Sequence, residues 1–305
     1  MQTKDIMQKV ADQVIKNIDK HDDNWLKSWV SSGMAKNIRG TYYKGMNTVI
    51  LWCVQQEFGY TSQTYATFNQ IKAKGGKVKK GEKGHQVIYM QPSLFRKARD
   101  NETADQDGSV KVQYNLMRSY CVFNLDQTNL EDQDIEAEGS DTLPKVEKYI
   151  ENTKADIRHD NDLFAGKCYY VPSKDYIGMV QKDKFKSING STATENYYST
   201  ILHELTHWTG HESRCDRKEK YKAKYFDNID KYAFEELVAE MGSAIQTCML
   251  GITLVPAKHN YQYLNVWKKR IKEQPNVLFK ASSFAQAGVN HILELQKEKS
   301  VKKVA

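Results

Sequence analysis

The sequence of 305 residues has no run of 18 or more apolar residues, which excludes an ordinary transmembrane helix. Its first twenty residues are charged throughout and contain no apolar signal-peptide core, so we expect a cytoplasmic protein. No Cys-x-x-Cys pair and no internal repeat occur. The cysteines are odd in number and widely spaced, which favours free, reduced thiols: Cys53, Cys121, Cys168, Cys215 and Cys248. With 40% hydrophobic residues, the chain is expected to fold, and it is long enough for two domains.

The net positive charge of the chain, +7, comes entirely from its first part. Residues 1–130 hold 19 Lys/Arg against 12 Asp/Glu, whereas residues 131–305 hold 26 of each. Such asymmetry is typical of a nucleic-acid-binding half joined to a neutral half. Between Asp126 and Asp141 there are seven acids and no basic residue, so we expect an acidic linker before Pro144.

Hydrophobic periodicity predicts the elements of the first half. Residues 3–30 are expected to be helical, with Trp25 and Trp29 as core aromatics. Further helices are predicted at 48–58 and around 64–73, strands at 85–91 and 111–123, and a loop at 100–110.

A segment rich in Gly, Tyr and basic residues at 37–47 is predicted to be a loop. Tyr42 and Tyr43 can stack on nucleobases there, while Arg39 and Lys44 contact phosphates. The alternative is a β-turn with ordinary surface residues.

The densest charge lies between Ile71 and Arg99, where nine Lys/Arg stand against one acid, Glu82. A charge run is usually a solvated face. Here the lysines fall on an expected hairpin flanked by aromatics, so we favour phosphate contacts by Lys77, Lys79, Lys80 and Lys83.

In the second half, residues 195–209 are predicted to form one helix that carries His203-Glu204-Leu205-Thr206-His207. The two histidines are four residues apart, so they share one helix face and can bind one metal ion. Glu204 stands beside the first of them, where it can activate water at the metal. The alternative is a helix that carries two histidines by chance.

A mononuclear zinc site of this class needs a third protein ligand. His211 follows His203 by eight residues, about 12 Å along a straight helix, which is too far for one ion. Ser213 stands where a metzincin would have its third histidine, so that class is rejected. A glutamate on a later helix, the gluzincin arrangement, is the remaining candidate.

The helix predicted at 232–250 supplies this glutamate. Glu236 and Glu240 are four residues apart and share a face, whereas Glu235 aligns with Ala239 and is the poorer partner. We predict Glu236 as the third ligand and Glu240 as the carboxylate that orients a ligand histidine. The alternative, a solvated acidic stripe, is disfavoured by the apolar surroundings, where unpaired carboxylates would be unfavourable. A helix at 144–155 and two strands within 163–180 complete this half.

Several segments of the first half resemble the single-stranded-DNA-binding domain of ArdC-type antirestriction proteins, which also begins plasmid primases of the TraC type. They are Asn37, Tyr43-x-Gly45-x-Asn47, Phe68-x-Gln70, Gly76-x-Val78-x-Lys80-Gly81-Glu82-Lys83 and Val122-Phe123-Asn124-x-x-Gln127. Tyr65 departs from the tryptophan usual in the family.

The resemblance continues into the metallopeptidase domain of the same proteins. The matching segments are Thr200 to His211, Arg214-x-x-Arg217 and Tyr232-Ala233-x-Glu235-Glu236-Leu237-Val238-Ala239-Glu240. Asp175 lies in the family's Asp-x-Ile segment, while Val180 and Cys215 are departures away from the expected chemistry. The family's role, protection of incoming plasmid or phage DNA against restriction, is what the resemblance implies for this chain.

We therefore predict an α+β fold of two domains: a small α+β module that binds single-stranded DNA at 1–130 and a gluzincin-like α+β metallopeptidase domain at 144–305, joined by an acidic linker at 131–143. The expected metal is Zn²⁺, with Mn²⁺ as the alternative. The expected partners are single-stranded DNA and a host restriction or defence protein as peptide substrate, with no membrane. The competing hypothesis is a DNA-coating protein whose metal domain is structural or silent. A nuclease is the weakest option, because no paired carboxylates accompany the basic half.

Overall fold

The computed structural model describes residues 3–22, 25, 27, 33–91, 94–97, 109–112, 116–132, 142–164, 166–188, 190–217, 231–255 and 260–297. Within these ranges, no helix combines the length and apolar character that a membrane span requires.

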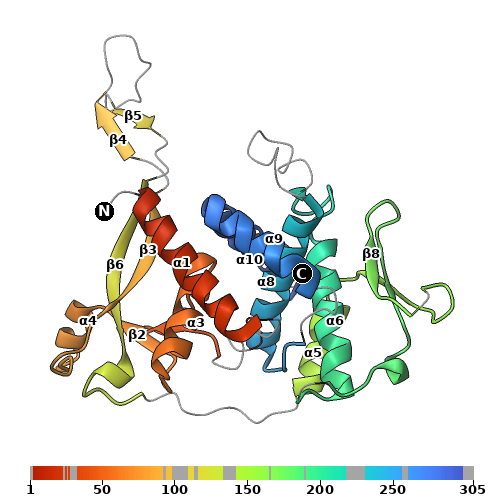
Figure 1. Ribbon diagram of the computed structural model, residues 1–305, viewed down its shortest axis with the longest axis horizontal. Coiled ribbons are helices and arrows are strands. Elements are labelled where there is room, and N and C mark those ends of the chain that lie inside the picture. The colour runs from red at the N-terminus through yellow and green to blue at the C-terminus, as the bar shows by residue number, and fades with distance from the viewer. Residues whose placement is uncertain are drawn as a thin grey trace, which may run out of the picture.

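The first half is built on a four-stranded sheet in the order β1-β2-β6-β3. β1 and β2 are parallel, and the other neighbours are antiparallel. A separate antiparallel pair, β4 and β5, projects from it (Figure 1). The elements are α1 (Thr3–His21), β1 (Lys36–Asn37), α3 (Met46–Phe58), β2 (Thr64–Ala66), α4 (Phe68–Ala73), β3 (His85–Gln91), β4 (Leu94–Lys97), β5 (Ser109–Val112), β6 (Leu116–Asn124) and the 3₁₀ turn η2 (Leu125–Gln127).

The second half places helices beside a three-stranded sheet in the order β7-β9-β8. β7 is parallel to β9, and β8 is antiparallel to it. The elements are α5 (Thr142–Glu151), β7 (Asp156–His159), β8 (Tyr169–Val171), β9 (Tyr176–Met179), η3 (Lys182–Lys184), α6 (Ala193–Trp208), α8 (Lys231–Leu250), α9 (Asn260–Glu273) and α10 (Asn276–Leu295).

The largest hydrophobic cluster joins the two halves. It contains buried residues of α1 and α3 together with those of α8, α9 and α10. α1 lies between the N-terminal sheet and the C-terminal helices (Figure 1). Trp25, expected as a core aromatic, is fully buried and packs edge-on against Trp267. The basic half is therefore packed directly onto the helices that carry the second half.

The predicted helices at 48–58, 195–209 and 232–250 are confirmed as α3, α6 and α8, and the two strands expected within 163–180 are β8 and β9. The fold class is α+β, as predicted. α3 is buried on nearly all sides and ends at Gly59, whose φ of 67° is the left-handed conformation that glycine adopts most easily.

Three sequence-based predictions about the first half were wrong. The helix expected from Thr64 begins only at Phe68, because residues 64–66 pair with β6 as strand β2, and Thr67 caps α4 through a reciprocal pair of bonds with Gln70. The strand expected over 111–123 is two strands, β5 and β6, with different partners. The lysines at 77–83 occupy an irregular loop rather than a hairpin, because Val78 bridges to Thr128 instead of to a neighbouring strand.

Some predictions lie outside the described residues. These are the placement of Trp29, most of the acidic linker (133–141) and most of the loop expected at 100–110 (100–108). The helix predicted at 144–155 is α5, which begins earlier, at Thr142.

Candidate functional site

α6 begins with a strong local signal. The Thr192 hydroxyl accepts from the Glu195 N–H, and the Glu195 carboxylate accepts from the Thr192 N–H, so two backbone groups at the start of the helix are satisfied. From this start, His203 and His207 fall on one face, and both are largely buried.

α8 approaches α6 closely at Gly242. A side chain at Gly242 would overlap the methyl group of Thr206, so only glycine permits this spacing. The Gln246 amide donates to the Leu202 carbonyl at 3.1 Å and to the Thr206 hydroxyl at 2.9 Å, which ties the two helices together. This crossing brings the carboxylates at the start of α8 to the histidines of α6.

His203, His207 and Glu236 converge on one point. The two Nε2 atoms are 3.2 Å apart, and they lie 3.5 Å and 3.6 Å from the two carboxylate oxygens of Glu236. Four tetrahedral zinc bonds of about 2.0–2.2 Å would place ligand atoms about 3.3–3.6 Å apart. The three side chains therefore fit a single divalent cation, and among the described residues they form the one such group.

Each histidine also meets a carboxylate at its other nitrogen. Glu240 Oε1 lies 3.1 Å from His203 Nδ1, and Glu235 Oε1 lies 3.2 Å from His207 Nδ1. The interpretation of Glu235 as the poorer partner was therefore wrong, because its carboxylate contacts a histidine as closely as that of Glu240 does. A proton held on Nδ1 by a carboxylate leaves the Nε2 lone pair for a metal.

Arg217 holds Glu235 in place. Its guanidinium is fully buried and donates to Glu235 Oε1 at 2.6 Å and to the Thr209 hydroxyl at 2.6 Å. A further bond reaches the Thr206 carbonyl, in the last turn of α6. Arg217 thus links the end of the histidine helix to the carboxylate behind His207.

The charges of this cluster stabilise one another. Burial alone would lower the pKa of both imidazoles, but the carboxylates of Glu240 and Glu236 raise that of His203, and those of Glu235 and Glu236 raise the pKa of His207 to about 9. Burial would raise the carboxyl pKa values, yet Arg217 and His207 lower the pKa of Glu235 to about 2, and the two histidines lower that of Glu236.

Glu204 faces the edge of the small sheet. Its Oε2 accepts from the Tyr170 N–H of β8 at 2.8 Å, and the side chain is 6% exposed. One edge of β8 pairs with β9, and the Tyr170 N–H lies on the opposite edge. The unpaired edge of β8 is therefore the edge that faces Glu204.

Polar contacts of Arg214 connect the β8–β9 turn to the end of α6. Arg214 stacks on the Trp208 ring, 3.9 Å from its centroid, and donates to the Trp208 carbonyl at 2.6 Å. The same guanidinium forms a bidentate ion pair with Asp175. The Asp175 carboxylate also accepts a hydrogen bond of 2.8 Å from the Tyr170 hydroxyl. Asp175, whose role the sequence left open, is therefore the residue that ties the β8–β9 turn to the end of the histidine helix.

His211, rejected as a ligand from its spacing, lies beyond the end of α6. Its Nδ1 contacts the Ser213 hydroxyl at 2.8 Å, and the side chain is not part of the three-residue group.

The residues predicted to bind DNA are mostly on the surface. Arg39, Lys44, Lys77, Lys79, Lys80 and Lys83 are exposed. Tyr42 is 54% exposed, but Tyr43 is half-buried and packs edge-on against Tyr65, so only the first tyrosine of the pair presents its ring to solvent.

The Lys-Gly-Glu-Lys segment is held by its polar residues. The Gln127 amide donates to the Glu82 carboxylate at 2.8 Å and to the Lys83 carbonyl at 3.0 Å. Lys79 donates through its ammonium to the Asp126 carbonyl at 2.7 Å. Gln127 and Asp126 thus fix a loop from which Lys80 and Lys83 extend.

Sequence reasoning missed several exposed aromatic rings in the first half. They are Phe58, Phe68, Tyr89 and Tyr120, each more than 40% exposed. The only signal for them was the place of Phe68 in a matched segment, because periodicity assigns an isolated aromatic to the core by default.

Comparison with known proteins agrees with these features. Residues 4–123 match the family model of the N-terminal domain of anti-restriction factor ArdC, and residues 144–284 match that of a zincin-like metallopeptidase. The metal-free crystal structure of the antirestriction protein ArdC from plasmid R388 is 33% identical, with a TM-score of 0.78 over 95% of this chain and 97% of that chain. Its Mn(II)-bound structure is 31% identical, with a TM-score of 0.70 over the same shares.

Curated relatives extend the comparison. A DNA primase TraC of Escherichia coli is 31% identical over 95% of this chain, but the chain spans only 27% of that primase. The uncharacterized protein y4eC of Sinorhizobium fredii is 27% identical over 92% of this chain and 89% of its own length.

Proposed function

Because the chain belongs to the ArdC family of antirestriction proteins, we propose that it protects incoming plasmid or phage DNA from host restriction in the cytoplasm, by binding single-stranded DNA and by hydrolysing a peptide bond at its metal site. The observation that carries the enzymatic part is the convergence of His203, His207 and Glu236, with Glu204 beside them.

His203, His207 and Glu236 would hold the metal. We expect Zn²⁺, since two imidazoles and a carboxylate are a ligand set of catalytic zinc, and we keep Mn²⁺ as the alternative because an ArdC relative was crystallised with Mn(II). When bound, the cation would supply a Lewis acid that polarises a carbonyl group and makes water more acidic.

Glu204 acts as the general base in this proposal. It takes a proton from the attacking water and returns it to the leaving amine. The Tyr170 N–H holds one carboxylate oxygen, and the other has no hydrogen-bond partner among the described residues. Glu235 and Glu240 keep the two imidazoles oriented while the substrate binds.

A peptide substrate would lie along β8. The outward edge of this strand runs beside Glu204, and an extended segment of a host restriction or defence protein can add to such an edge through main-chain hydrogen bonds.

The DNA-binding part rests on the exposed basic loops. Arg39 and Lys44 lie on one loop and Lys77, Lys79, Lys80 and Lys83 on another, with Tyr42 as the exposed ring between charged neighbours. Basic side chains that follow a backbone, together with aromatic rings that stack on bases, bind single strands with little sequence preference.

The competing function is DNA coating alone, with a silent metal domain. The deciding experiment introduces unmodified plasmid DNA into a restricting host that expresses the wild-type chain, Glu204→Ala or Glu212→Ala, an exposed control. We expect Glu204→Ala to keep its fold and metal content and to lose protection, whereas the control retains it. Full protection by a folded, metal-loaded Glu204→Ala variant would instead assign antirestriction to DNA binding.

A further inference from the structure

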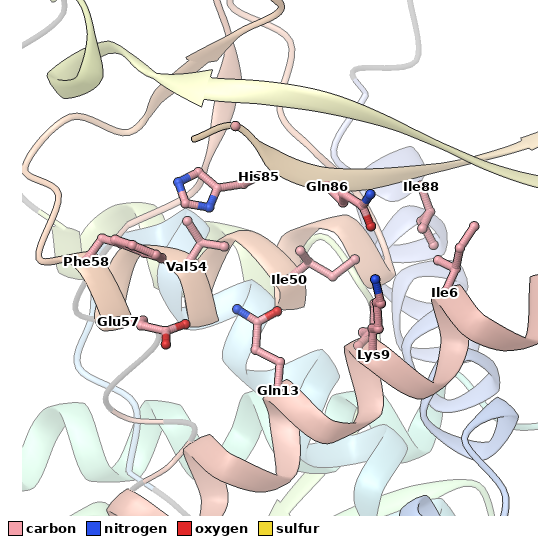
Figure 2. A pocket seen from close by; sticks show the side chains of 12 residues that line it. Ile6, Lys9, Gln13, Ile50, Val54, Glu57, Phe58, His85, Gln86 and Ile88 are labelled. Carbon is pink, nitrogen blue, oxygen red and sulfur yellow. The ribbon is translucent and has the colours of Figure 1, made fainter. Parts of the chain in front are cut away.

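A cavity of about 290 Å³ lies between α1, α3 and β3, outside the metal centre (Figure 2). Its floor is apolar and consists of the buried side chains Ile6, Val10, Ile50 and Val54. Small-molecule sites combine such a floor with a few converging polar groups, and the cavity volume lies just below their usual range of about 300–1,000 Å³. The space therefore suits one compact group rather than a large ligand.

Three polar side chains enter this space from opposite walls. Lys9 and Gln13 extend from α1, and Gln86 extends from β3 toward them (Figure 2). None of the three has a side-chain hydrogen bond or ion pair within the described parts of the chain. The cavity thus offers one ammonium group and two amides that can each donate and accept.

An aromatic face closes one end of the cavity. Phe58 is 55% exposed and stacks parallel to Tyr60, with ring centroids 5.6 Å apart and an angle of 9°. The Phe58 and His85 rings pack edge to face, with their centroids 4.8 Å apart. A hydrogen bond of 2.9 Å between His85 Nε2 and the Tyr60 hydroxyl holds the three rings together. A rigid, solvent-facing ring beside free amides is an arrangement that receives a nucleobase by stacking.

The charge of the cavity also suits a nucleotide. Glu57 lines it but is paired with Lys16 at 2.8 Å, so its charge is compensated. Lys9 has no such partner among the described residues and remains available for a phosphate.

We propose that this cavity binds one unstacked nucleotide of a DNA single strand. The base stacks on Phe58, its edge meets the amides of Gln13 and Gln86, and the adjoining phosphate pairs with Lys9. This inference rests on the single-stranded-DNA binding proposed above and adds to it a base-holding site that is distinct from the basic loops.

The test measures the affinity of labelled oligonucleotides of about 20 nucleotides, poly-dT and poly-dA, for the full chain. We expect Phe58→Ala to weaken binding about tenfold, as for the loss of one base–aromatic stack, and Phe58→Trp to retain it. We expect the pair Gln13→Ala and Gln86→Ala to weaken binding severalfold and to change the ratio of dA to dT affinity.

Two matched controls accompany these variants. Gln8→Ala removes another glutamine of α1, the helix of Gln13, whose amide donates to Asp12 at 2.9 Å. Leu163→Ala removes an exposed apolar side chain of the second half. Both should bind like the wild type, and melting temperatures verify that all variants are folded.

Wild-type affinity in both Phe58→Ala and the glutamine pair would overturn the cavity assignment. If reversal of Lys80 and Lys83 still weakened binding in that case, the proposed DNA binding would stand without the cavity. A wild-type chain that bound neither oligonucleotide would overturn both.

Discussion

Glu235 Oε1 lies 3.2 Å from Nδ1 of His207, and the same oxygen accepts a 2.6 Å hydrogen bond from Arg217. The arrangement orients the imidazole from behind and directs its Nε2 toward Glu236, 3.6 Å away. Glu240 Oε1 lies 3.1 Å from Nδ1 of His203, so each histidine has a carboxylate of α8 behind it, and the same helix supplies the third ligand candidate. A single helix crossing therefore determines most of the proposed metal site.

Neighbouring glutamates of α8 are predicted to differ in their effect on metal binding. Glu236→Gln removes a charged ligand, so we expect metal content after dialysis to fall to near zero. Glu235→Gln keeps all three candidate ligands but removes the carboxylate that orients His207 and pairs with Arg217, and losses of such orienting groups weaken metal affinity about 10–100-fold. Elemental analysis of both proteins, with Glu212→Gln as an exposed control, measures the difference. Equal losses, or a greater loss in Glu235→Gln, would refute Glu236 as the third ligand.

The sequence predicted the parts of this site that depend on one helix at a time. Spacing of four residues placed His203 with His207 and Glu236 with Glu240, because helix geometry is local. The same spacing wrongly placed Glu235 below Glu240 as a partner of the histidines. Which carboxylates of α8 reach the histidines depends on how α8 crosses α6, and this crossing involves the close approach of Gly242 and Thr206, which no pattern within one helix reveals. Arg217 also escaped prediction, since its contacts form only after the chain has turned back on the end of α6.

The same difference between local spacing and tertiary contacts explains the wrong predictions in the first half. The helix expected from Thr64 was wrong because pairing with β6 takes residues 64–66 into the sheet, and periodicity cannot foresee that pairing. The core shared by α1 and the C-terminal helices is likewise a tertiary property, which no charge or composition boundary reveals.

Gly242 is predicted to control the distance between α6 and α8. A side chain there must displace Thr206, so we expect Gly242→Val to destabilise the protein by about 1–3 kcal/mol and to weaken metal binding. Thermal unfolding of metal-free protein measures the first effect. Thr206→Ser removes the methyl group, which would lie nearest the added Cβ, but keeps the hydroxyl at 2.7 Å that Gln246 contacts, so it should recover only part of the loss in the double variant. No recovery would mean that another contact limits the crossing.

Asp175 is predicted to contribute to acid sensitivity. Its hydrogen bonds from Arg214, with burial opposing, lower its pKa below the ordinary value of 3.8. A lowered folded-state pKa stabilises the protein above pH 3.8, and this contribution is lost as the pH falls through the folded-state value. Since the side chain is 37% exposed, the contribution is expected to be below about 1 kcal/mol.

The measurement is the melting temperature of wild type and Asp175→Asn from pH 6 to pH 3. We expect the variant to be less stable at pH 6, with the two curves converging toward pH 3. Asp162→Asn, an exposed acid whose carboxylate forms no ion pair with the other described residues, serves as the control and should follow the wild type. A constant gap between Asp175→Asn and wild type over the whole range would show that packing, not charge, accounts for the loss.

The basic loop offers a test of DNA binding in which total charge is controlled. Lys79 is bonded to the Asp126 carbonyl, so its reversal would also disturb the loop, whereas Lys80 and Lys83 extend freely into solvent and can be reversed without that effect. We expect Lys80→Glu with Lys83→Glu to weaken single-stranded-DNA binding and to reduce the slope of log affinity against log salt by about 0.7 for each lost phosphate contact. Lys145→Glu with Lys148→Glu makes the same change in net charge on α5, in the neutral half, and should leave the slope unchanged. If the two pairs reduced affinity and slope equally, binding would depend on overall charge and not on this loop, because a local phosphate contact cannot be lost from a distant helix.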